Sequence, residues 1–490
     1  MTEQDISPYL LETISGDKWK IIGIKKRAGV VIPLFSAYSK ESLGIGDFRD
    51  LKIAIDWVKS TGNSILQLLP MNEVGPVFCP YDANSSFALE PMYISIKDLG
   101  GSFKKDIQER IEQIRRDFKP KGLYVNYAIK KRKLELLWDI YASSYGSEDC
   151  FEFRKENHYW IDDFALFNVI KKHRKGTAWY EWEEKLRDRD EGALSLFKKE
   201  HLKEVDFEIW VQYHLYKQFK SVKEYAASRQ VLLKGDLPIL VSLDSADVWA
   251  KRGYFKLGFA AGAPPDMYCA KGQRWGMPTY NWERIKEDGF IYIRQKLKFA
   301  ESFYDLLRID HVAGIFRIWS IPYDEPLENK GLNGSFDPED QDKWAGQGRE
   351  ILSVMAESSN MLLCAEDLGI IPRVCIDTLR EFGIPGNDVQ RWVKDWSVKH
   401  DFLDPQEYRQ LTVAMLSTHD TTNWVAWWEN EAGTVDEDLF RRKCSDRRRI
   451  DFSQIKDKLF DSGFSRHGRL YWKKEIDSID KLVAVLSRPK

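Results

Sequence analysis

Residues Leu306 to Gly314 read LLRIDHVAG, an apolar run that ends abruptly in charged and polar side chains. This pattern favours a buried strand that stops where polar groups are wanted. Side chains alternate along a strand, so Arg308 and Asp310 should point the same way and Ile309 the opposite way. A guanidinium beside a carboxylate favours the ionised form, and an ionised, oriented aspartate can act as a nucleophile. Taken alone, however, the stretch favours a structural ion pair at a strand end.

Two later segments share this pattern. The apolar run Met361 to Ala365 leads into Glu366, and the run Val413 to Leu416 leads to His419 and Asp420. In barrels of parallel strands, catalytic groups lie at the C-terminal ends of several strands. Two carboxyl groups flanking a glycosidic bond are the usual apparatus for cleaving it. Three strand-end acids therefore indicate a catalytic site more strongly than one does.

The stretches RIDH (308–311), AEDLG (365–369) and STHD (417–420) resemble, in this order, the catalytic segments of 4-α-glucanotransferases, the amylomaltases or disproportionating enzymes. Other matching stretches are GVVIPLFSAYS, LGIGDF, CPYDANSSFALEP, GDLPILVSLDSADVW, AGAPPD and GQRWGMPTYNW. The resemblance runs from about Gly29 to about Trp424, and FRIW after RIDHVAG is closer to the plant-cytosolic disproportionating type. It implies a TIM (β/α)8 barrel that transfers α-1,4-glucan segments to another maltodextrin or to glucose through a covalent glycosyl-aspartate.

The resemblance also implies a role for each matching residue. Asp310 would be the nucleophile, Glu366 the general acid and base, and Asp420 the carboxylate that holds sugar hydroxyls. Because Glu366 follows an apolar run, burial should raise its pKa and keep it protonated until it donates its proton. The substrate contacts that the resemblance implies are Tyr81, Asp244, Gln273, Trp275, Arg308, His311 and His419. On chemistry alone, Asp236 or Asp247 could be mistaken for Asp244. A structural histidine remains the rival interpretation of His311.

Composition narrows the class of protein. With 43% hydrophobic and 31% charged residues among 490, the chain has the balance of a globular protein with an ample core. A formal net charge of −2 offers no attraction to nucleic acid or acidic membranes, and no apolar run is long enough to span a membrane. The six cysteines show neither C-x-x-C pairing nor metal-site spacing, which fits a reducing cytoplasm. We expect no metal and no other cofactor, and the oligomeric state stays open.

The expected organisation is an N-terminal extension, residues 1–28, followed by a catalytic barrel, residues 29–490. A long, charged helical region, residues 100–228, should interrupt the barrel between its second and third strands as an inserted subdomain. The loop Gly262 to Gly272 should form a rim over the cleft. After the seventh strand the chain ends in DKLVAVLSRPK, which is typical of a helix, so the eighth strand of the family is expected to be missing.

Two other functions remain open on the sequence. An α-amylase-type retaining glucan hydrolase would share the barrel and the acids. A catalytically impaired glucan-binding protein would fit a chain that lacks the family's final segment, although the presence of Asp310, Glu366 and Asp420 argues against it.

Overall fold

The structure is a computed structural model that describes residues 6–100, 103–120, 124–143, 150–266, 269–395, 401–423 and 425–427, together with strands at 434–436, 465–466 and 469–471. The chain divides into two compact units, Met1–Gly386 and Asn387–Lys490, which are described separately. The expected final helix and the question of the eighth strand fall largely on residues 437–464 and 472–490, outside the described residues. Among the described helices, none combines the length and the hydropathy that crossing a membrane requires.

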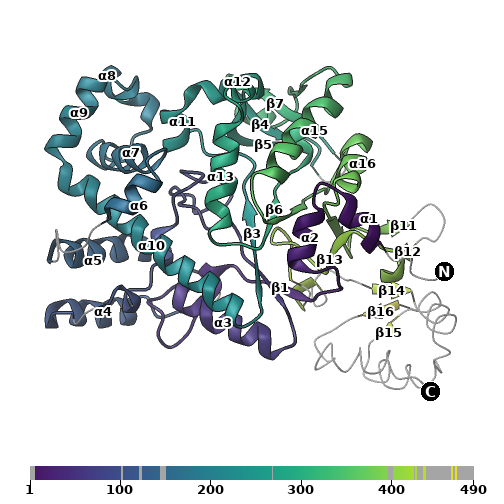
Figure 1. The fold of residues 1–490 in the computed structure, drawn as a ribbon, viewed down its shortest axis with the longest axis horizontal. Helices are drawn as coiled ribbons and strands as arrows, with labels where there is room; N and C mark the ends of the chain where they lie inside the picture. The colour runs from purple at the N-terminus through teal and green to yellow at the C-terminus, as the bar shows by residue number, and fades with distance from the viewer. Residues whose placement is uncertain are drawn as a thin grey trace. The chain divides into compact units, whose positions relative to one another are not determined.

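A parallel sheet forms the centre of the first unit (Figure 1). Its strands, in spatial order, are β1 (Gly29–Val31), β2 (Ile65–Gln67), β3 (Leu232–Leu237), β6 (Leu306–Ile309) and β9 (Leu362–Ala365), and every neighbouring pair is parallel. A helix precedes each strand after the first: α3 (Phe48–Ser60), α10 (Leu202–Ser228), α13 (Ile291–Glu301) and α15 (Asp342–Glu357). The α/β class and the parallel arrangement of the strands expected from the sequence are confirmed.

Helix α3 shows why the local sequence folds as it does. Its N-cap Asp47 accepts hydrogen bonds from the amides of Arg49 and Asp50, and the Asp50 side chain accepts from the Asp47 amide. This capping box satisfies amides that the helix itself leaves unpaired. The face that the helix buries against the sheet is the apolar stripe Phe48, Leu51, Ile55 and Val58.

The segment between β2 and β3 is helical and lies to one side of the sheet (Figure 1). It contains α4 (Lys105–Asp117), α5 (Ile129–Ser143), α6 (Phe151–Glu156), α7 (Ile161–His173), α8 (Glu184–Arg187), α9 (Glu191–Glu200) and α10. Helix α7 packs on α10. Lys133 of α5 donates from Nζ to the carbonyls of Met92 and Ile94, at 2.6 and 2.7 Å, which ties the helices to the loop after β2.

An antiparallel sheet that was not predicted from the sequence is formed by strands that follow β3 in the chain. Its order is β5 (Gln273–Tyr280), β4 (Phe255–Ala263), β7 (Ile318–Pro322) and β8 (Ser335–Asp337). The segment Gly262 to Gly272, expected to be a loop throughout, thus begins inside β4 and ends at the residue before β5. The sequence of β4, FKLGFAAGA, lacks the apolar and polar alternation by which a half-buried strand is recognised.

Short helices complete the first unit. Helices α11 (Ala246–Ala250), α12 (Trp282–Glu287) and α14 (Ala313–Phe316) lie in the connections, and α16 (Arg373–Glu381) follows β9. The N-terminal helices are α1 (Ser7–Glu12) and α2 (Gly16–Ile22). Both are hydrogen-bonded to the C-terminal end of α16. Tyr9 of α1 donates from its hydroxyl to the carbonyl of Arg380, and Trp19 of α2 donates from Nε1 to the carbonyl of Gly383 at 2.8 Å.

The second unit contains short sheets in its described residues. Strand β10 (Gly386–Val389), which begins at the boundary, pairs with β13 (Thr412–Met415). Strands β11 (Lys394–Asp395) and β12 (Asp401–Phe402) are antiparallel, as are β14 (Thr434–Asp436), β16 (Arg469–Tyr471) and β15 (Ser465–Arg466). Strand β13 leads towards the third acidic stretch, STHD.

Candidate active site

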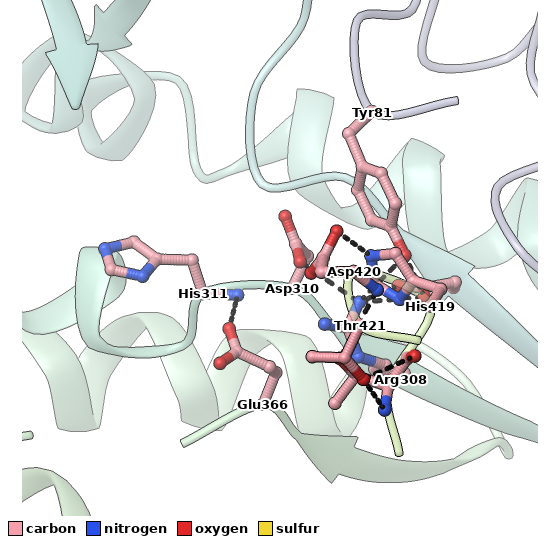
Figure 2. A network of polar contacts seen from close by, with 10 residues as sticks. Tyr81, Arg308, Asp310, His311, Glu366, His419, Asp420 and Thr421 are labelled. Carbon is pink, nitrogen blue, oxygen red and sulfur yellow. Dashed lines mark hydrogen bonds and ion pairs between the residues drawn. The ribbon is translucent and has the colours of Figure 1, made fainter. Parts of the chain in front are cut away.

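The strand ladder places Asp310 and Glu366 side by side. Hydrogen bonding continues one residue past the ends of β6 and β9, since the Glu366 amide donates to the carbonyl of Ile309 at 2.9 Å. On the other side, the Asp310 amide donates to the carbonyl of Leu237 at 3.2 Å. The two acids therefore stand at the C-terminal ends of adjacent parallel strands, at the same edge of one sheet (Figure 2).

Arg308 joins the strand-end acids into one charged cluster. It is the register partner of Asp236 on β3, and its Nη1 lies 2.6 and 2.8 Å from the two carboxylate oxygens of Asp236. The same Nη1 lies 3.0 Å from Asp310 Oδ1, so Arg308 and Asp310 share one side of the strand as expected. The side chains of Arg308 and Asp236 are only 7% and 0% exposed. Charges this deeply buried are tolerated only when they are paired.

Tyr81 completes this cluster from the loop after β2. Its hydroxyl donates to Asp236 Oδ2 at 2.7 Å, and Arg308 Nη1 donates to the Tyr81 oxygen at 3.3 Å. Burial, with the Asp236 charge adding to it, raises the pKa of Tyr81 well above its ordinary value. Tyr81 is therefore a neutral phenol whose ring stands beside the charged cluster (Figure 2).

Glu366 lies in a different environment from Asp310. Its carboxylate oxygens accept from the amides of His311, at 2.7 Å, and Leu368, at 3.1 Å. Burial raises the pKa of Glu366 to about 8, the charge of Arg308 opposes the rise, and the charge of Asp310 adds to it. The raised pKa expected from the preceding apolar run is thus present, and Glu366 is mostly protonated at neutral pH.

His311 connects the sheet edge to the antiparallel sheet. Its backbone is left-handed, with φ of 43°, which is uncommon for a residue with a side chain. Burial, and secondarily the charge of Arg317, lowers the pKa of His311 to about 4, so its imidazole is neutral. The ring meets Trp275 of β5 edge to face, with 5.0 Å between ring centroids. Trp275 Nε1 in turn donates to Gln273 Oε1 at 3.0 Å.

A pocket of about 390 Å³ opens beside Trp275. Arg274, on its wall, is fixed by donating to the carbonyls of Glu325 and Tyr323 at 2.6 and 2.7 Å. The wall thus offers an aromatic face and polar groups, a combination suited to a sugar ring. The residues that line the pocket are Cys269, Gly272, Gln273, Arg274, Trp275, Gly276, Leu327 and Lys330.

Asp236, which the sequence offered only as an alternative to Asp244, lies beside Arg308 and Tyr81. Asp244, which was singled out, accepts from Lys171 Nζ and from the Trp179 amide, so it is tied to the helical segment. Asp247 accepts from the Tyr292 hydroxyl at 2.6 Å. Position along the chain was the available signal: Asp236 lies within the mostly buried strand β3, where an acid needs a buried partner.

His419 and Asp420 belong to the second unit and follow β13. His419 Nε2 lies 3.0 Å from Asp420 Oδ1, and the Asp420 amide donates to Thr418 Oγ1 at 3.3 Å. The histidine side chain is 13% exposed and the aspartate side chain 74% exposed. Within its unit, Asp420 is therefore an accessible carboxylate held beside an imidazole.

The parallel α/β sheet presents a carboxyl with a raised pKa beside an arginine-paired carboxylate at its C-terminal edge. Pairs of acids at the C-terminal ends of barrel strands are typical of the class of enzymes that break glycosidic bonds.

Comparison with known proteins specifies the family. Residues 32–472 match the family model described as 4-alpha-glucanotransferase. The chain is 37% identical to a 4-alpha-glucanotransferase of Chlamydia pneumoniae over 436 residues, which cover 87% of this chain and 80% of that protein. It is 26% identical to the rice 4-alpha-glucanotransferase DPE2, over 83% of this chain and 58% of the rice protein. The chain belongs to the 4-α-glucanotransferase family, as its motifs predicted.

A solved structure agrees with this result. The amylomaltase from Streptococcus agalactiae in complex with acarbose superposes with a TM-score of 0.72 at 25% identity, covering 95% of this chain and 100% of that one. The fold of the chain is therefore the amylomaltase fold.

Proposed function

We propose that the chain is a retaining 4-α-glucanotransferase that moves α-1,4-glucan segments from one maltodextrin to another or to glucose. The observation that carries the proposal is the contrast between the neighbouring acids Asp310 and Glu366. Asp310 is paired with Arg308 at 3.0 Å, whereas the pKa of Glu366 is raised to about 8. A retaining reaction needs these two states, a charged nucleophile and a proton donor, on opposite sides of the bond that breaks.

In the first half of the reaction, Asp310 Oδ attacks the anomeric carbon of the donor sugar. The bond from that carbon to the leaving oxygen breaks, and Glu366 gives its proton to this oxygen. In the second half, Glu366 takes the proton of the acceptor 4-hydroxyl, which attacks the same carbon and releases Asp310. Inversion at each half gives net retention.

The remaining candidate residues hold the substrate in this proposal. Tyr81 presents its ring to the sugar at the cleavage point, while Arg308 and Asp236 keep the nucleophile and the phenol in place. His311 and His419 donate hydrogen bonds to sugar hydroxyls, and Asp420 accepts from them. Asp244 contacts the donor chain alongside its bonds to the helical segment. Gln273 and Trp275 border the pocket in which the acceptor sugar is placed.

Transfer must outcompete hydrolysis, because water also reaches the glycosyl-enzyme. Positioning of an acceptor can reach effective molarities of ~10⁵ M or more, enough to outcompete bulk water at about 55 M. The pocket beside Trp275 supplies an aromatic wall for this purpose, and Arg274 is held rigidly there by two carbonyls.

Incubation with maltotriose tests the proposal. A transferase gives glucose and a ladder of longer maltodextrins with almost no net gain of reducing ends. Trp275→Ala should shorten the ladder and leave slow hydrolysis, whereas Leu332→Ala, at an exposed side chain outside the pocket lining, should leave it unchanged. A rise in reducing ends that follows substrate loss, without longer products, would identify an amylase-like hydrolase instead.

A further inference from the structure

A second cluster of ligand-type side chains lies in the helical segment between β2 and β3. His173 is the last residue of α7, His201 directly precedes α10, and Glu204 lies in the first turn of α10. Their ligand atoms all lie within 4.8 Å of one another. The proposed glucan chemistry uses none of these three residues.

The geometry converges on one carboxylate oxygen. Glu204 Oε1 is 2.9 Å from His173 Nε2 and 3.5 Å from His201 Nδ1. Zinc binds imidazole nitrogen and carboxylate oxygen at about 2.0–2.2 Å in tetrahedral sites, which places neighbouring ligand atoms about 3.3–3.5 Å apart. Small rotations of the side chains therefore suffice to bring all three donors onto one ion.

The surroundings hold the two imidazoles in position. Phe197 of α9 contacts both rings, with centroid separations of 5.8 Å to His173 and 4.3 Å to His201. The two histidine side chains are 33% and 23% exposed, so an ion can reach the cluster from solvent. A partly exposed site with three protein donors leaves a position for water.

One neighbouring cation limits the affinity. Lys172 Nζ lies 2.8 Å from Glu204 Oε2, whereas the two histidines contact the other oxygen, Oε1. Lys172 can keep this contact while Oε1 binds the ion, but its positive charge disfavours a second cation nearby. Removal of that charge should therefore strengthen metal binding.

We propose that His173, His201 and Glu204 bind a divalent transition-metal ion of the zinc type. Two imidazoles and one carboxylate suit zinc and its first-row neighbours, whereas calcium and magnesium prefer oxygen donors alone. The ion would join the end of α7 to the start of α10, and so stabilise the packing of the helical segment. The cysteine spacing in the sequence did not predict this site.

Calorimetric titration of the chelator-treated full chain with ZnCl₂ tests the proposal. We expect one ion per chain, a rise in Tm on binding, and no saturable binding of CaCl₂. His173→Ala and His201→Ala should each weaken zinc binding by about 100-fold or more, while Lys172→Met should tighten it. His158→Ala, at an exposed histidine outside the cluster, should leave the affinity unchanged.

Two results would overturn the proposal: no saturable zinc binding by the unmodified chain, or unchanged affinity in both His173→Ala and His201→Ala. Circular dichroism of each variant shows whether it is folded. Should a variant fail to fold, cobalt(II) added to the unmodified chain gives a second measurement, because tetrahedral coordination produces intense visible absorption and a surface-bound aqua ion does not.

Discussion

Glu366 retains its proton at neutral pH because burial outweighs both the Arg308 charge and the two amides that donate to its carboxylate. In the mechanism proposed here, the protonated form is the one that starts the reaction. Asp310, one strand away, performs its part as a charged group beside Arg308. Environment, rather than residue type, thus assigns the two roles.

This assignment predicts the pH profile of glucan transfer. The free enzyme must carry the Glu366 proton to react. The value of kcat/KM for maltotriose should therefore fall about tenfold per pH unit once the pH exceeds the Glu366 pKa of about 8. Glu366→Gln should lose about 10²–10⁴-fold in turnover, keep its affinity for oligosaccharide, and lack the alkaline limb. Initial rates measured from pH 5 to 10 at low substrate check this. An alkaline limb that persists in Glu366→Gln at the same pH would assign it to another group.

A substitution of Asp310 tests its proposed role as the nucleophile. Asp310→Asn should abolish turnover, because an amide cannot form the glycosyl ester, and mass spectrometry of the quenched reaction should find no glycosylated chain. Asp324→Asn, at a surface aspartate between β7 and β8, is the matched control and should retain full activity. Measurable transfer by Asp310→Asn would remove this residue from its proposed role.

Among the elements, strand β3 packs closely against the ring of Tyr304, which precedes β6. Gly235 faces away from Asp236, and a Cβ added there would lie 2.5 Å from the ring of Tyr304. Gly235→Ala should therefore force the strand or the ring to shift and destabilise the chain by about 1–3 kcal/mol. Because Asp236 is the next residue, transfer activity should fall as well.

Urea unfolding of Gly235→Ala measures the loss. Gly346→Ala, in the middle of α15 with nothing within 4 Å of the new methyl group, is the matched control. It should stabilise the chain by up to about 1 kcal/mol, the helix-propensity difference between the two residues. Equal effects of the two substitutions would argue that Gly235 is not closely packed.

The same elements show what the sequence could and could not predict. Strands with continuous apolar runs, such as β6 and β9, and the capped helix α3 follow from local pattern alone. Strand β4 was missed because its small residues do not alternate in polarity. Asp236 was named only as an alternative to Asp244, because its partner Arg308 is distant in the chain. The cluster at His173 was missed for the same reason: its donors come together only when α7 packs beside α10.

Across the first unit, buried carboxyl groups make stability depend on pH. Asn168 donates to Glu208 at 3.2 Å and to Glu73 at 3.4 Å, which joins α7 and α10 to the loop after β2. Burial, with the Glu73 charge adding to it, raises the pKa of Glu208 to about 7. Between the ordinary glutamate pKa and this value, the folded state binds more protons than the unfolded state. The free energy of unfolding should therefore fall as pH rises through this window.

Glu208→Gln should remove the part of this slope that Glu208 contributes, while Glu366, whose pKa is raised to about 8, keeps its own part. The neutral amide has no charged form to desolvate, so the variant should gain up to about 3 kcal/mol relative to the parent at pH 8 and little at pH 4.5. Tm measured across this range checks the prediction. Glu152→Gln, at an exposed glutamate of the same segment, should leave the slope as it is. A parent chain whose stability rises steadily from pH 4.5 to 8 would contradict the sign.

The shared ladder of β6 and β9 also constrains the gene. Deleting or inserting one codon within either strand would turn every following side chain to the opposite face, because strand residues alternate. Asp310 and Glu366 would then leave their adjacent rungs. The number of codons in these two strands is therefore fixed.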